Sequence, residues 1–179
     1  MQSPIIHLHI PKTGGTSVYT YFSSHAFPGV QPCFPRYSVR CCGTSKNLRR
    51  TVAAIKGRKC NMASDEWWYE EVASHVPNAR IVTTLRDPLQ EIRSQMEHDI
   101  AKTVKGEHDR YRTPQEKLAN PRMAGYQIEN AQSVRLGVRN MSYASMETFM
   151  RERIYALGIT DYMWHTFCLF SHIFDAFDT

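Results

Sequence analysis

Ile5-Ile6-His7-Leu8-His9-Ile10-Pro11-Lys12-Thr13-Gly14-Gly15-Thr16-Ser17 is the stretch of sequence that decides the fold. The segment up to Ile10 is short, β-rich and almost wholly apolar, which is typical of a strand buried on both faces in a parallel sheet. The glycine pair then ends the strand, and the apolar spacing after Thr16 predicts an amphipathic helix. Strand, glycine loop and helix in this order indicate a phosphate-binding unit.

The glycine loop contains the groups that such a site needs. Backbone N–H groups at the start of a helix point outward at the positive end of the helix dipole, and Gly14 and Gly15 allow a ligand to approach them closely. Lys12 adds a charge, while Thr16 and Ser17 add hydroxyl donors. In the common triphosphate loop the lysine follows the glycines, so its position here argues against an ATP site. A tight turn without a ligand is the alternative interpretation.

A second switch from strand to helix is expected after Ile81–Leu85. Asp87 suits the N-cap and Pro88 the first position of a helix that should extend towards Ile100. Two such units, with a sheet between helices, predict a single α/β domain over residues 1–179 with a P-loop-like central parallel sheet. Further helices are predicted at Glu66–His75, Gln127–Leu136, Ser145–Leu157 and Tyr162–Phe177, with a short helix or strand near 51–63 and a polar loop at 101–120.

Arg86 and Ser94 are the candidates for a second anion site. In doubly wound sheets ligands bind at the carboxyl ends of the strands, so the ends of the two predicted strands can face one site. Arg86 would supply a forked donor and Ser94 a hydroxyl. The alternative is that Arg86 forms an ion pair with Asp87 or Glu91.

Composition limits the classes of protein and partner. The chain has 179 residues, 42% of them hydrophobic, which suits one core better than two. A formal charge of +5 favours anionic partners in general. Because no apolar run reaches about 18 residues, we expect no membrane span. The five cysteines lack the spacing of a zinc site, so we predict no metal site. A disulfide from Cys33 or Cys42 to Cys60 is one possibility for them, and fully reduced thiols are the other.

His9–Ser17, taken together with Thr84–Pro88 and Ser94, resembles the sulfotransferases that use 3′-phosphoadenosine 5′-phosphosulfate (PAPS). The similarity is greatest to the branch that acts on carbohydrates, including the heparan sulfate and galactosyl-lipid enzymes. It implies that the 3′-phosphate is bound by Arg86 and Ser94. It also implies that the 5′-phosphosulfate is bound by Lys12, Thr13, Gly14, Gly15, Thr16 and Ser17.

Two weaker similarities extend the resemblance from about His7 to Phe177. Glu129-Asn130-Ala131-Gln132 with Arg135 is similar to a family segment near the acceptor, and Gly158–Tyr162 is similar to a late turn before a helix. Relatives continue beyond the last helix with another basic segment. The resemblance therefore implies a truncated or divergent enzyme, in which binding can survive while turnover is weak.

The resemblance implies in-line sulfuryl transfer to a hydroxyl, with Lys12 stabilising the leaving phosphate and without a metal. Carbohydrate sulfotransferases often place a Gly-His pair where this chain has Ser64-Asp65-Glu66. We therefore predict that Glu66, or else Asp65, takes the acceptor proton. The equally favoured alternative is that both carboxylates only stabilise the start of a helix through its dipole. His98 and His9 are further candidates for the base.

The expected partner is a hydroxyl-bearing acceptor, either a carbohydrate or a glycolipid. Glycan-modifying relatives are held in the Golgi by an N-terminal anchor, so the Golgi lumen is expected if an anchor is missing from this sequence and the cytoplasm otherwise. The main alternative function is a non-catalytic module that binds PAPS or another nucleotide. A kinase is disfavoured by the loop order, and no motif supports nucleic-acid binding.

Overall fold

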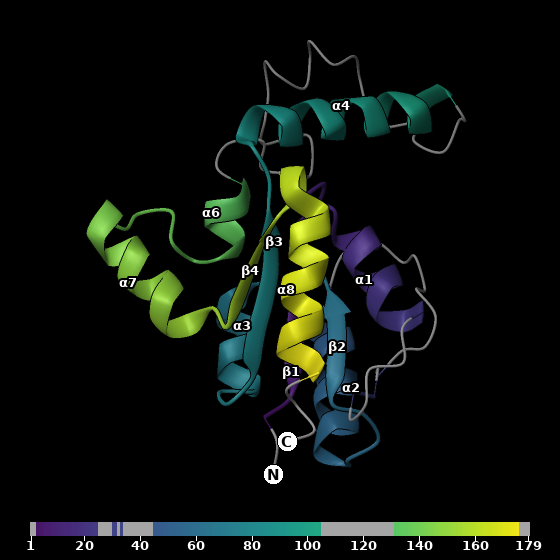
Figure 1. Ribbon diagram of the computed structural model, residues 1–179, viewed down its shortest axis with the longest axis vertical. Coiled ribbons are helices and arrows are strands. Elements are labelled where there is room, and N and C mark those ends of the chain that lie inside the picture. The colour runs from purple at the N-terminus through teal and green to yellow at the C-terminus, as the bar shows by residue number, and fades with distance from the viewer. Residues whose placement is uncertain (1–2, 25–29, 32, 34–44, 105–130, 176–179) are drawn as a thin grey trace.

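A four-stranded parallel sheet forms the centre of the molecule (Figure 1). The computed structural model describes residues 3–24, 30–31, 33, 45–104 and 131–175. Neighbouring strands are parallel throughout, in the order β2-β1-β3-β4. All four strands therefore end at one edge of the sheet, here called the carboxyl edge. Their bounds are β1 (Ile5–Leu8), β2 (Met62–Asp65), β3 (Arg80–Leu85) and β4 (Ala156–Ile159).

Helices cover both faces of the sheet, and α4 runs across its carboxyl edge (Figure 1). Strand and helix alternate along much of the chain, as parallel pairing requires, because each strand must return to the same edge through a crossover. The helices are α1 (Gly15–Ser24), α2 (Ser45–Lys56), α3 (Tyr69–His75), α4 (Pro88–Val104), α6 (Ala131–Arg135), α7 (Tyr143–Arg153), the 3₁₀ helix η1 (Thr160–Tyr162) and α8 (Met163–Asp175).

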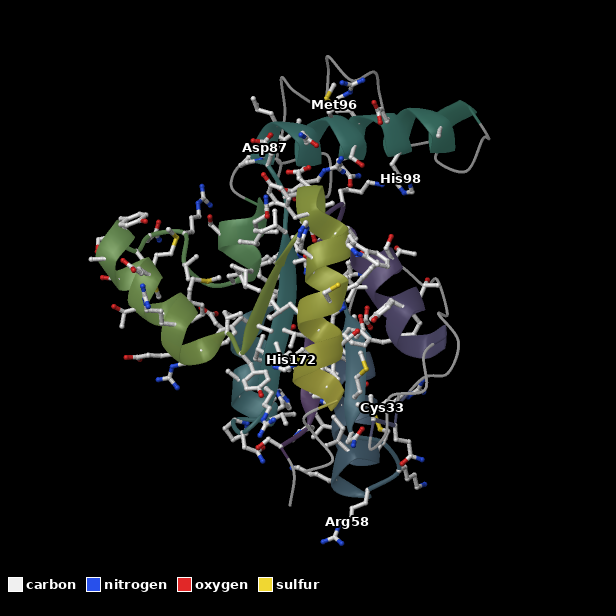
Figure 2. The ribbon with its side chains drawn as sticks, viewed as in Figure 1. Cys33, Arg58, Asp87, Met96, His98 and His172 are labelled. Atoms are coloured by element: carbon white, nitrogen blue, oxygen red, sulfur yellow. A yellow bond between two sulfur atoms is a disulfide. The ribbon has the colours of Figure 1, made fainter. Side chains whose placement is uncertain are left out.

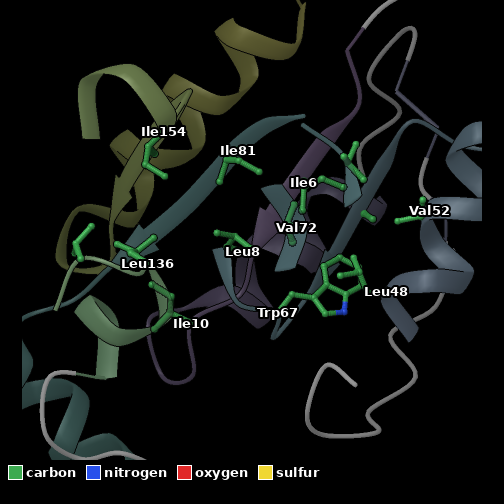
Figure 3. Packing of buried hydrophobic residues seen from close by; sticks show 13 residues of the cluster. Ile6, Leu8, Ile10, Leu48, Val52, Trp67, Val72, Ile81, Leu136 and Ile154 are labelled. Carbon is green, nitrogen blue, oxygen red and sulfur yellow. The ribbon is translucent and has the colours of Figure 1, made fainter. Parts of the chain in front are cut away.

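Alternate residues of β1 belong to two separate hydrophobic clusters. Ile6 and Leu8 pack with residues of α2 and α3 on one face (Figure 3), whereas Ile5 packs with α1 and α8 on the other. Both faces of the strand are therefore buried, which explains its nearly continuous apolar sequence. Phe170 and Phe174, four residues apart on one face of α8, are fully buried.

The fold class predicted from the sequence is confirmed, but two element boundaries were wrong. The helix expected from Glu66 begins at Tyr69, because Met62–Asp65 forms strand β2 beside β1. Leu157, expected at the end of a helix, lies in β4 beside β3. In both places pairing within the sheet overrides weak local preference. Several expectations lie outside the described residues. They are the start of the helix expected at Gln127–Leu136, the end of the helix expected at Tyr162–Phe177, and most of the polar loop expected at 101–120.

Asp87 and Pro88 begin α4 as predicted. The backbone N–H groups of Leu89 and Gln90 donate to Asp87 Oδ1, each at 3.0 Å, and Pro88 is the first helical residue. This cap fixes the direction in which the chain leaves the carboxyl edge.

Within the described part of the chain, no helix combines the length and apolar character that crossing a membrane would need.

A disulfide joins Cys33 to Cys60 just before β2. The Cys33 N–H also donates to the Met62 carbonyl at 2.7 Å, and the N–H of Asn61 donates to the Gln31 carbonyl at 2.9 Å. The bond thus fastens an upstream segment beside the start of an edge strand. Of the two partners that the sequence left open for Cys60, the structure has Cys33, while Cys42 lies outside the described residues.

Removing this disulfide should lower the free energy of unfolding by about 2–4 kcal/mol, because the bond closes a loop in the unfolded chain. Urea unfolding of the double variant Cys33→Ser/Cys60→Ser, compared with the oxidised parent, measures the loss. Cys168→Ser, which changes an exposed free thiol, is the matched control and should stay within about 0.5 kcal/mol. An equally stable double variant would contradict the expectation.

Candidate functional site

The loop from Lys12 to Ser17 follows β1 at the carboxyl edge and leads into α1. Lys12 and Gly14 both have positive φ angles, 65° and 80°, so the backbone folds tightly there. The first helical hydrogen bond runs from Val18 N–H to the Gly14 carbonyl at 3.1 Å. The amides of Gly15, Thr16 and Ser17 precede that bond at the positive end of the helix. The side chains of Thr16 and Ser17 are exposed beside them.

Thr13 lies inside the structure and holds the loop in place. Its side chain is fully buried, and its hydroxyl donates to the Ile10 carbonyl at 2.8 Å. Because a hydroxyl has one proton, the contact of 3.2 Å with Thr84 must be a bond that Thr84 donates. The Thr160 hydroxyl lies 2.6 Å from the Thr13 carbonyl and 3.0 Å from the Leu85 carbonyl. The last residues of β3 are thereby joined to residues that follow β1 and β4.

The His9 ring packs against the same loop at Gly15. A Cβ atom at Gly15 would lie only 1.9 Å from His9 Cδ2, so no other residue fits at this position without movement. His9 also stacks on His7, with ring centroids 6.1 Å apart. Glycine is therefore required here by close packing against an imidazole ring.

Both imidazole rings are neutral in the folded protein. Burial, together with the charge of neighbouring His9, lowers the pKa of His7 to about 3. Burial, followed by the charges of Arg135 and Lys12, lowers the pKa of His9 to about 4. His7 Nδ1 lies 2.7 Å from Ser64 Oγ on the neighbouring strand. These histidines therefore pack and align the sheet beneath the loop without adding charge to it.

Arg86 reaches back from the end of β3 to the glycine loop. Its Nη1 donates to the Lys12 carbonyl at 3.3 Å, and its Nη2 lies 3.4 Å from Gln90 Oε1. Its Nε is buried and has no hydrogen-bond partner among the described residues. No carboxylate of the described part of the chain lies within 4.0 Å, so the alternative of an ion pair with Asp87 or Glu91 is not realised there.

Gln132 fixes the backbone from which the Arg86 side chain leaves. The Arg86 N–H donates to Gln132 Oε1 at 3.0 Å, and Gln132 Nε2 donates to the Arg86 carbonyl at 2.8 Å. Burial raises the pKa of the nearby Glu91 carboxyl, while its hydrogen bond with Gln132 and the charge of Arg86 oppose that rise. The side chain of Gln132 thus ties α6 to the end of β3.

Ser94 and His98 lie on α4, the helix that crosses the carboxyl edge. Figure 2 shows His98 on this helix at the same end of the molecule as Asp87, while His172 lies far along α8. Ser94 is half-buried. The structure therefore puts Ser94 and His98 on the element that begins at the Arg86 motif.

Asp65 and Glu66 lie where β2 ends, next to the end of β1. The Asp65 carbonyl accepts from His9 N–H at 3.0 Å, and Asp65 Oδ1 accepts from Glu66 N–H at 2.8 Å. Burial raises the pKa of the Asp65 carboxyl above its usual value, although the Glu66 amide and the charge of Arg135 oppose the rise. Both carboxylates are therefore at the edge that carries the glycine loop.

Arg135 at the end of α6 reaches the same place. Its Nη1 donates to the Glu66 carbonyl at 2.7 Å, and its guanidinium lies over the Trp68 ring, 4.6 Å from the centroid. In the sequence, Arg135 and Gln132 stand out only through a weak family similarity, and Thr160 has no predicted role. A hydroxyl just past a strand, and polar and basic side chains in a short helix, are the signals that could have identified Thr160, Gln132 and Arg135.

The carboxyl edge therefore joins three kinds of group: outward backbone amides, the cations Lys12, Arg86 and Arg135, and two carboxylates. Such a set suits the binding of a polyanion and the transfer of a proton beside it. Among the residues described, no group of three or more His, Cys, Asp or Glu side chains could hold a metal ion.

Comparison with known proteins identifies the class of fold. No protein-family model matches the chain, and no similar protein was found among curated sequences. A crystal structure of a sulfotransferase from Alicyclobacillus acidocaldarius aligns with 97% of this chain and 79% of that chain, with a TM-score of 0.55 and 14% sequence identity. The molecule therefore has the fold of that sulfotransferase.

Replacing Gly15 with alanine should lower the free energy of unfolding by about 1–3 kcal/mol, because the added methyl group would overlap His9. In a His9→Ala background the same replacement should cost much less. Urea unfolding of the parent, both single variants and the double variant gives the coupling. Gly57→Ala, where the nearest atom is the Ala53 carbonyl oxygen at 3.2 Å, is the control. Additive effects of the Gly15 and His9 changes would rule out this packing constraint.

Proposed function

We propose that this protein is a sulfotransferase that moves a sulfuryl group from PAPS to a hydroxyl group of a carbohydrate or glycolipid. The observation that supports this most strongly is the meeting of two anion-binding elements. Arg86 Nη1 bonds to the Lys12 carbonyl at 3.3 Å, although the two residues are 74 positions apart in the sequence. The fold shared with a sulfotransferase supports the same conclusion.

The residues present fit a nucleotide with two separate phosphate groups. The amides of Gly15, Thr16 and Ser17 and the ammonium of Lys12 would bind the 5′-phosphosulfate, while Gly14 lets the ligand approach. Thr13 would hold the loop in shape, because its side chain is buried and cannot contact the ligand. Arg86, whose buried Nε has no partner among the described residues, would bind the 3′-phosphate together with Ser94.

The transfer would proceed by in-line displacement. The acceptor oxygen attacks sulfur and loses its proton to a carboxylate, while the bond between sulfur and the bridging 5′-phosphate oxygen breaks. Adenosine 3′,5′-bisphosphate leaves with the electron pair of that bond. Lys12 and the loop amides stabilise the charge that grows on the leaving oxygen, which is the main catalytic effect expected in such a site.

Asp65 and Glu66 are the proposed proton acceptors. Both follow β2 at the carboxyl edge, and a carboxyl group whose pKa is raised is a stronger base near neutral pH. The rise in the pKa of Asp65 that burial causes suits that task. The Cys33–Cys60 disulfide favours an oxidising compartment, such as the Golgi lumen.

Lys12→Ala and Arg86→Ala should each weaken binding of adenosine 3′,5′-bisphosphate by about tenfold or more, since each removes a charge-assisted contact to a phosphate. Isothermal titration calorimetry with that nucleotide and with PAPS measures the loss, and ATP as a competitor separates this site from that of a kinase. Arg151→Ala, which changes an exposed arginine paired with Glu147 on α7, is the matched control. Failure of the parent protein to bind either nucleotide would eliminate the proposal.

Either Asp65→Asn or Glu66→Gln should lower kcat by about a hundredfold or more, because general-base catalysis contributes that much, and should leave nucleotide affinity almost unchanged. Transfer of labelled sulfate from PAPS to a panel of sugars and glycolipids is the measurement. A parent protein that binds the nucleotide tightly but transfers sulfate to no acceptor would instead be the non-catalytic binding module. Full activity in both variants would exclude these carboxylates as the base.

A further inference from the structure

The two helices that cover one face of the sheet carry almost no charge. Helices α1 and α8 pack side by side over that face (Figure 1), with the rings of Tyr21 and Phe167 stacked 4.4 Å apart. Neither helix contains lysine, arginine or glutamate, and their one acidic residue is Asp175, the last of α8. Helices α2 and α7, which pack against the other cluster, contain several arginines. Among the described helices, α1 and α8 thus form an almost uncharged layer in a chain whose net charge is +5.

The outer side of α8 exposes apolar side chains. Trp164 keeps 75% of its surface exposed and Leu169 keeps 42%. Cys168 is an exposed free thiol, and it lies one helical turn after Trp164 on the same side of the helix. Tyr162, just before α8, is also exposed. Exposed aromatic and aliphatic side chains without charges among them have the composition of the centre of a protein–protein interface.

The lack of charge on α1 and α8 indicates the kind of partner. Nucleic acid and anionic membranes are bound through lysine and arginine, which these two helices do not contain. Two copies of this chain, each with a net charge of +5, repel one another when their charged surfaces meet. An uncharged face lets them meet without placing like charges in contact. The charge pattern therefore favours a second copy of the chain as the partner.

We propose that the outer side of α8, together with the adjoining side of α1, is the contact between two copies of this chain in a symmetric dimer. This inference does not depend on the proposed function. In a two-fold contact both copies use the same surface, so a single apolar stripe can serve both partners. An axis near the middle of α8 brings the Cys168 thiols of the two copies towards each other. It also covers Trp164 and Leu169 in both copies, and burial of such side chains stabilises the association.

Analytical ultracentrifugation of the full chain over roughly 1–200 µM tests for the dimer, because its population depends on concentration. Trp164→Lys and Leu169→Lys should each raise the dimer dissociation constant about tenfold or more, since each places two like charges across the axis. Tyr143→Lys is the matched control, because Tyr143 is 77% exposed on the charged helix α7. It should leave the dissociation constant within about twofold. Circular dichroism of each variant checks that it has folded.

The salt dependence of the parent protein gives a test that needs no variant. Raising sodium chloride from about 0.05 M to about 0.5 M screens the repulsion between the two positively charged copies. The dimer should therefore become tighter or stay unchanged. An interface built on ion pairs would weaken instead, and that result would contradict an uncharged contact.

Chemical cross-linking locates the contact on α8. A short bismaleimide reagent should join Cys168 of one copy to Cys168 of the other, because both thiols lie near the axis. Cys168→Ser should abolish the covalent dimer although it keeps Cys41 and Cys42. The same variant should still associate in the ultracentrifuge, because serine is close to cysteine in size.

Three results would overturn the inference. The first is a parent protein that stays monomeric over the whole concentration range. The second is a dimer that neither α8 variant weakens, or that Tyr143→Lys weakens as strongly, because the contact would then lie elsewhere. The third is a monomer that binds neutral phosphatidylcholine vesicles and loses that binding in Trp164→Lys, which would make this face a lipid-binding surface. Nucleotide binding enters none of these measurements, so the proposed function is tested separately.

Discussion

The buried hydroxyl of Thr13 is the point on which the rest of the site depends. It donates to the Ile10 carbonyl and accepts from Thr84, while the Thr13 carbonyl accepts from Thr160. Leaving any of these buried groups without a partner would cost more than the bond itself contributes. Three strand ends are therefore held in one arrangement, and the glycine loop takes its shape from that arrangement rather than from its own flexible sequence.

Under the proposed function a rigid loop matters, because amides that are to bind an anion must already point outward before the anion arrives. Arg86 and Arg135 are also held in place before any ligand binds. Two hydrogen bonds to Gln132 fix the Arg86 backbone, and Arg135 is stacked on Trp68 and hydrogen-bonded to the Glu66 carbonyl. Among the described residues, the hydrogen-bond and stacking partners of these two cations are neutral groups and not carboxylates. The charge of each cation thus stays available to a ligand, and the entropy of ordering its side chain is lost during folding and not on binding.

The sequence was most informative where local signals were strong. The apolar run at Ile5–Ile10, the glycine pair and the Asp87-Pro88 cap predicted β1, the loop and the start of α4 because each has its own chemistry. Strands β2 and β4 were missed because their identity comes from pairing with neighbours. The contact between Arg135 and Glu66 joins residues 69 positions apart, so no spacing rule could have predicted it. For the same reason the sequence did not choose the disulfide partner of Cys60.

The disulfide also bears on how separate molecules behave towards one another. Strand β2 is paired only with β1 among the described strands, and an open strand edge is a common starting point for association between molecules. Gln31 and Cys33 satisfy backbone groups at the beginning of that edge, and the bond to Cys60 keeps them there. Oxidation of this cysteine pair therefore keeps backbone groups at the start of the open edge satisfied, at a distance from the glycine loop.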